Sequence, residues 1–138
     1  MTAAVRSSAA SLREPAVVAL AGTAVLGLLR VHDPHVDGSY GFCPFLLVTG
    51  QPCPGCGGLR AVNDLTRGDL VGAVSANAAV VVLLVVLGVA WVAWVLRRLR
   101  GVDDRMIVLS TRTGLAVLAG FVLFGIIRLT PPGSWLAP

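Results

Sequence analysis

Charged residues are scarce in this sequence, and lysine is missing altogether. Only 13% of its 138 residues are charged and 56% are hydrophobic, so the chain is too apolar for a water-soluble core of its size. Its eleven basic residues, all arginine, lie between apolar runs and are not interleaved with aromatic residues. The net charge of +4 therefore does not indicate a nucleic-acid partner. We predict an integral membrane protein in contact with the lipid bilayer.

Three apolar runs predict three transmembrane helices. The uncharged run over residues 70–96 would be about 40 Å long as a helix, more than the roughly 30 Å hydrocarbon core requires. Trp91 and Trp94, followed by arginines, indicate a membrane interface at its end. The other spans are residues 15–31, expected to be an uncleaved anchor, and about 106–129, where Arg112 and Arg128 are expected to reach lipid headgroups. The predicted fold is an all-α membrane protein with one integral domain over residues 1–138.

The distribution of arginine predicts the orientation of these helices. The segment between the second and third spans is the richest, and arginine-rich segments stay in the cytoplasm. We therefore expect a multi-pass protein of the cell membrane, with a cytoplasmic N-terminus and with residues 32–69 outside. The arginines of that cytoplasmic segment are Arg97, Arg98, Arg100, Arg105 and Arg112.

The segment between the first two spans is rich in cysteine, proline and glycine, and it contains all three cysteines of the chain, Cys43, Cys53 and Cys56. Its Cys-Pro-Gly-Cys-Gly stretch is typical of the turns that hold zinc or iron. In such turns proline (Pro54) fixes one φ angle, glycines (Gly55 and Gly57) permit positive φ, and backbone N–H groups face the sulfurs. A zinc or iron site is therefore one candidate at this turn.

The ligand set of this predicted site is incomplete in the sequence. Cys43 can supply a third sulfur, and the fourth ligand is open between His35, His32, an aspartate, and a solvent or partner group. A second cysteine knuckle is missing. No histidine directly follows Cys56, which argues against covalent attachment of a c-type haem.

Two other interpretations of the cysteines stay open. Cys53 and Cys56 precede a short predicted helix, residues 58–66, whose N-terminus would lower a thiol pKa, so they are candidates for a redox pair with Cys43 as the resolving thiol. A structural disulfide also suits an oxidising compartment. Because no general base, nucleophile or phosphate-binding loop surrounds the turn, we expect a non-enzymatic protein whose rigid loop binds metal or docks a partner, such as another membrane protein or a second copy. The alternative is a membrane thiol-disulfide oxidoreductase.

Several residues near the turn are expected to support it. The helix over residues 58–66 is amphipathic and predicted to lie at the interface with its charges in water. Arg60, beside the turn, is a candidate contact for an anion or a headgroup phosphate. Asp69 is expected to cap the second span, and Asn77 is a candidate to accept a hydrogen bond from the cysteine site or to bond a neighbouring helix.

The sequence resembles an uncharacterised bacterial family of small multi-pass membrane proteins, the domain of unknown function 2752. The pattern of that family is Cys-Pro, Thr-Gly and then Cys-Pro-Gly-Cys-Gly-x-Thr-Arg-Ala. Leu59 stands where the family usually has threonine. The resemblance implies a membrane protein in which the Cys-Arg segment is important, and it implies no reaction. The matching residues are Cys43-Pro44, Thr49-Gly50, Cys53 to Gly57, and Arg60-Ala61.

Overall fold

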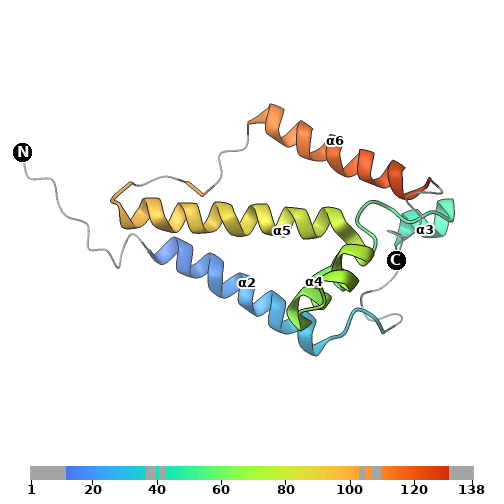
Figure 1. Cartoon of the computed structure of the whole chain (residues 1–138), viewed down its shortest axis with the longest axis horizontal. Coiled ribbons are helices and arrows are strands. Elements are labelled where there is room, and N and C mark those ends of the chain that lie inside the picture. Colours follow the sequence, from blue (N-terminus) through green and yellow to red (C-terminus); the bar gives the residue numbers. More distant parts are fainter. Residues whose placement is uncertain (1–11, 37–39, 41–42, 103–104, 107–109, 131–138) are drawn as a thin grey trace, which may run out of the picture.

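The computed structural model describes residues 12–36, 40, 43–102, 105–106 and 110–130, and in this part of the chain the regular structure is entirely helical. The long helix α5 lies in the middle, with α2 along one side of it and α6 on the other (Figure 1). This confirms the predicted all-α fold with a short helix between the first two spans. The helices are α2 (Arg13–Val31), α3 (Pro44–Thr49), α4 (Gly58–Arg67), α5 (Leu70–Leu99) and α6 (Thr111–Arg128).

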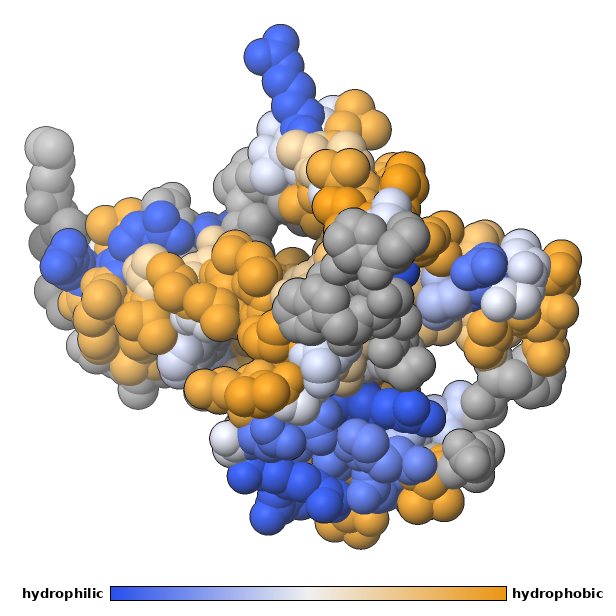
Figure 2. Space-filling model, turned by 45° about the vertical axis from the view of Figure 1, so that its right-hand side comes forward, coloured by the Kyte–Doolittle hydropathy of each residue, from blue (hydrophilic) through white to orange (hydrophobic). Residues whose placement is uncertain are grey.

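Three of these helices, α2, α5 and α6, are long and apolar enough to cross a membrane. Their large apolar side chains are mostly exposed; Val82 and Val89 of α5, for example, are 62% and 65% exposed. Hydrophobic residues cover much of the face shown in Figure 2, and hydrophilic residues gather in its lower part, at the height of α4 in Figure 1. An apolar exterior of this extent suits lipid rather than water.

Helix α5 is kinked at Asn77, whose φ of −164° and ψ of 93° are not helical. Each part of the helix begins with its own cap. The Asp69 carboxylate accepts from the Gly72 N–H at 2.8 Å, and Asn77 Oδ1 accepts from the Val80 N–H at 3.1 Å. Residues 78–99 then extend about 33 Å, the thickness of a bilayer core.

Side chains near the end of α5 bond residues at the start of α2. Trp91 Nε1 donates to the Pro15 carbonyl at 3.2 Å, and Arg98 forms an ion pair with Glu14. Trp94 is 4% exposed, with the Arg98 guanidinium 5.5 Å from its ring centroid. At this predicted membrane interface Trp94 is therefore covered by protein, and Arg98 pairs with Glu14 of α2.

The short helix α4 packs against α5 and α2 and does not lie free on a bilayer. Asn63 is fully buried, and its Nδ2 donates to the Leu29 carbonyl in the last turn of α2 at 2.6 Å. Arg30 Nη1 in turn donates to the Thr66 carbonyl at 3.1 Å. The predicted charges in water are wrong for Asp64, which is only 8% exposed. Asn63 of α4 thus satisfies a carbonyl that the end of α2 leaves without a partner, and Arg30 of α2 satisfies one near the end of α4.

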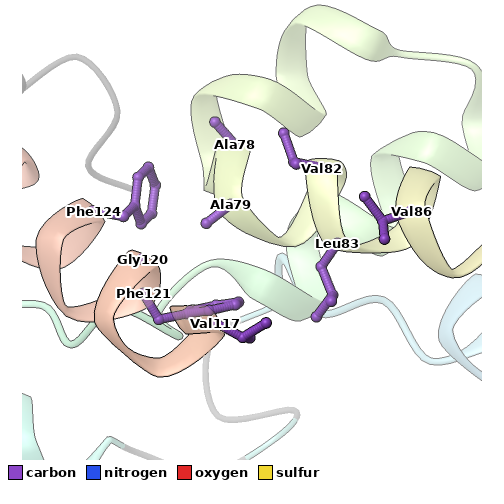
Figure 3. A pocket seen from close by; sticks show the side chains of 9 residues that line it. All are labelled: Ala78, Ala79, Val82, Leu83, Val86, Val117, Gly120, Phe121 and Phe124. Atoms are coloured by element: carbon purple, nitrogen blue, oxygen red, sulfur yellow. The ribbon is translucent and has the colours of Figure 1, made fainter. Parts of the chain in front are cut away.

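Helices α5 and α6 diverge from the end where the cysteines lie, and an apolar cleft of about 400 Å³ separates them (Figures 1 and 3). Side chains from both helices point into it. The lining is apolar and lies within the two spans. The lining includes Val82, Leu83 and Val86 of α5 and Val117, Gly120 and Phe121 of α6.

Candidate metal centre

The three thiols lie together in the structure. Their Sγ atoms all lie within 4.8 Å of one another, and Cys53 Sγ is 3.4 Å from Cys56 Sγ. All three cysteines are free thiols of intermediate exposure. Sulfur atoms around a tetrahedral zinc ion, bonded at about 2.3 Å, are about 3.8 Å apart. The thiols of Cys43, Cys53 and Cys56 therefore fit a metal ion in donor chemistry and in spacing.

Backbone hydrogen bonds shape the turn that carries two of these thiols. The Cys56 N–H donates to the Cys53 carbonyl and the Gly58 N–H to the Gly55 carbonyl, both at 3.0 Å. Gly57 has a φ of +78°, which glycine adopts without strain, and it leads directly into α4. Gly55 does not have a positive φ. Of the two glycines predicted to need one, Gly57 is the one that does.

Cys43 is placed by α3, a short helix that our sequence analysis missed. Cys43 is its N-cap residue, Pro44 begins it, and Gly50 ends it with a φ of +68°. Proline at the first position and glycine just after the last was the signal that could have revealed this helix. The effect is that Cys43 reaches the other two thiols from a separate element.

The three thiols have unequal acidity. A hydrogen bond from the Leu46 backbone N–H lowers the pKa of the Cys43 thiol to about 7. Burial, followed by hydrogen bonds with Cys53 and Cys43, raises the pKa of Cys56 to about 12. Near neutral pH Cys43 is thus readily a thiolate, while Cys56 keeps its proton until a cation replaces it. Metal binding at this site must release protons.

Asn77 connects the kink of α5 to the cysteine turn. It is fully buried, and its Nδ2 donates to the Pro54 carbonyl at 2.9 Å and to the Cys56 carbonyl at 3.0 Å. Its Oδ1 is occupied by the Val80 N–H. Asn77 was a candidate to accept a hydrogen bond from the cysteine site. Its side chain donates two bonds to the turn instead, and its Oδ1 caps the second part of α5.

Arg128, at the end of α6, also bonds the cysteine turn. Its side chain is only 2% exposed, and it donates from Nη1 to the Cys56 carbonyl at 3.0 Å and from Nη2 to the Ala76 carbonyl at 3.2 Å. In an unbroken helix the Val80 N–H would bond the Ala76 carbonyl. At the kink this N–H bonds Asn77 Oδ1 instead, so the Ala76 carbonyl is free to accept the second bond from Arg128. The expectation that Arg128 reaches lipid headgroups is wrong, since these carbonyls hold it inside.

A close contact between Gly125 and Pro54 also joins α6 to the turn. A Cβ atom added at Gly125 would lie 2.6 Å from Cγ of Pro54. Only glycine allows the helix backbone to come so near the proline ring. Neither Gly125 nor Arg128 was predicted to belong to the site. The available signal was that a chain with three spans has the end of the third helix on the same side as the segment between the first two.

His35, one of the candidates for the fourth ligand, is paired with other groups. His35 contacts two carboxylates, with Nδ1 2.9 Å from Asp33 and Nε2 3.3 Å from Asp64. Arg60 donates from Nε to the Pro34 carbonyl at 3.2 Å, so it fastens the loop after α2. Within the described residues, the cysteines are the one group of three or more potential ligands that lie together, and neither histidine belongs to it.

Comparison with known proteins agrees with the resemblance stated above. Residues 43–91 match the family described as "Protein of unknown function (DUF2752)". The match includes the three cysteines and Asn77 but ends before α6, so Arg128 lies outside it. Neither a curated protein nor a solved structure matches the chain.

Proposed function

We propose that this protein is a non-enzymatic metal-binding protein of the cell membrane, in which Cys43, Cys53 and Cys56 hold a zinc or iron ion at the membrane surface. The observation that carries the proposal is the convergence of three Sγ atoms within 4.8 Å. Two different elements supply them, and buried side chains of α5 and α6 bond the backbone between them. Thiolates are strong ligands for both metals.

A site with three protein ligands leaves one coordination position for another molecule. Closed structural zinc sites have four protein ligands, whereas sites with three keep a position for water or an incoming ligand. The three cysteines are of intermediate exposure, so this position can be approached. We propose that the rigid cysteine loop is where a partner docks, either another membrane protein or a second copy of the chain.

The same proposal includes an orientation in the membrane. The helices α2, α5 and α6 alternate in direction, so the cysteine turn and the end of α6 lie at one end of the molecule and the segment between α5 and α6 at the other (Figure 1). Arginine is most abundant at that latter end of the molecule, where the last turn of α5, the segment itself and the first turn of α6 carry Arg97, Arg98, Arg100, Arg105 and Arg112. The cytoplasmic preference of arginine then places the N-terminus inside the cell and the cysteines outside.

Metal analysis of the detergent-purified protein tests this function. We expect one zinc or iron ion per chain in the wild type, release of that ion on acidification, and its loss in Cys53→Ser. His35→Ala is the matched control, because His35 pairs with Asp33 and Asp64 and should not affect the metal. Metal-free wild-type protein that also fails to bind added zinc would overturn the proposal.

A thiol-disulfide oxidoreductase is the second candidate. The 3.4 Å separation of Cys53 Sγ and Cys56 Sγ and the lowered pKa of Cys43 favour it. In that reaction two of the thiols would become a disulfide and release two protons and two electrons, and a substrate disulfide would take them up as two thiols. Reduction of a disulfide substrate at a rate lost in Cys53→Ser would establish this enzyme class.

A further inference from the structure

The buried guanidinium of Arg128 has no carboxylate partner among the described residues. Its two Nη atoms bond carbonyls, its plane lies over Phe124 at 5.3 Å from the ring centroid, and its buried Nε has no hydrogen-bond partner. Carbonyls orient a cation but carry no net charge. Burying a charge without a counter-ion is unfavourable. The position of Arg128 at the C-terminal end of α6 offsets part of this cost through the helix dipole.

Among the described residues, the thiols of the turn lie beside Arg128 and can become negative. Arg128 bonds the backbone carbonyl of Cys56 itself, so its charge lies beside that residue and its neighbour Cys53. We propose that Arg128 is the counter-ion of an anionic three-thiolate metal site, an inference that rests on the proposed function. Arg128 is thus a positioning residue that both orients the turn and balances its charge.

The balance of charges favours a divalent ion at this site. Three thiolates contribute three negative charges, and a divalent ion with the guanidinium contributes three positive charges, so the assembly is neutral overall. A disulfide between Cys53 and Cys56 carries no charge and would leave Arg128 uncompensated. The same arginine therefore stabilises the metal-bound state relative to the oxidised one.

Two variants of Arg128 separate charge from shape. Arg128→Lys keeps the positive charge and loses the planar fork, whereas Arg128→Gln keeps a hydrogen-bond donor and loses the charge. We expect the zinc affinity, measured by competition with a chromophoric chelator, to fall about 10- to 100-fold in Arg128→Gln, as for other groups that support metal ligands, and much less in Arg128→Lys. Equal losses in both variants, or none in either, would overturn the inference.

A readout without metal tests the position of the Arg128 charge separately from the proposed metal binding. In chelator-treated protein, a positive charge beside the thiols accelerates alkylation by anionic iodoacetate relative to neutral iodoacetamide. We expect this rate ratio to exceed that of the uncharged reference thiol N-acetylcysteine amide in the wild type and in Arg128→Lys, and to fall in Arg128→Gln. The wild-type comparison decides the question even if Arg128→Gln does not fold, because a ratio equal to that of N-acetylcysteine amide contradicts a local positive charge.

The two readouts distinguish the possible failures. A wild-type protein that binds no zinc but prefers iodoacetate would refute the metal function and still place the charge of Arg128 beside the thiols. Zinc binding with an unchanged affinity and rate ratio in Arg128→Gln would leave the metal function standing and refute the role of Arg128.

Discussion

Asn77→Ala is expected to destabilise the protein by about 3 to 5 kcal/mol and to abolish metal binding. The substitution removes both bonds to the cysteine turn and the cap of the second part of α5. Asn77 is fully buried, and each buried polar group that loses its partner costs about 1–3 kcal/mol. The measurement is unfolding in mixed detergent micelles followed by circular dichroism, with metal content determined on the same sample.

Two further variants show which bonds of Asn77 matter. Asn77→Asp keeps an acceptor for the Val80 N–H but cannot donate to Pro54 and Cys56, so it should retain helix α5 and lose the metal. Ser75→Ala removes only a local bond to the Gly72 carbonyl and should change little. If Asn77→Ala proved as stable as Ser75→Ala, the role of Asn77 as a link between α5 and the turn would be wrong.

Gly125→Ala should have the second large effect. The added methyl group would meet Cγ of Pro54 at 2.6 Å and two further ring atoms within 3.4 Å, so either α6 or the cysteine turn must move. Overpacking of this kind costs about 1–3 kcal/mol. We also expect weaker metal binding, because the displaced ring belongs to the residue between Cys53 and Gly55. Thermal unfolding in detergent and zinc competition measure the two effects.

Gly120→Ala is the matched control for this substitution. Gly120 lies in the same helix, and an added Cβ there meets nothing within 4 Å. Both changes gain the same helix propensity, about 1 kcal/mol, so the difference between them isolates the contact with Pro54. Equal stabilities of the two variants would contradict the close approach of α6 to the turn.

Local signals in the sequence were enough to predict the three long helices, α4 and the cluster of cysteines, although not the short helix α3. Long apolar runs predict transmembrane helices because their length matches the thickness of the bilayer core. Asp69 caps the start of α5 by bonding the N–H of Gly72, only three residues away. Cys43, Cys53 and Cys56 are near one another in the chain, and proline and glycine beside them favour turns. Each of these inferences depends on residues within a few positions of one another.

The contacts that complete the site depend on residues far apart in the chain. An arginine at the end of a membrane helix usually reaches the headgroups, and Arg128 turns inward because the kink at Asn77 frees a carbonyl for it. That kink forms because the Asn77 side chain bonds the Val80 N–H in place of a backbone carbonyl. His35 was a candidate ligand by residue type alone, and two aspartates hold it away from the cysteines.

X-ray absorption at the zinc edge of the zinc-loaded protein tests the central claim most directly. A site formed by Cys43, Cys53 and Cys56 predicts three sulfur ligands at about 2.3 Å and one nitrogen or oxygen ligand at about 2.0–2.1 Å. In Cys43→Ser the sulfur count should fall to two. A shell of nitrogen and oxygen alone, or a sulfur count that Cys43→Ser leaves unchanged, would contradict a three-cysteine metal centre.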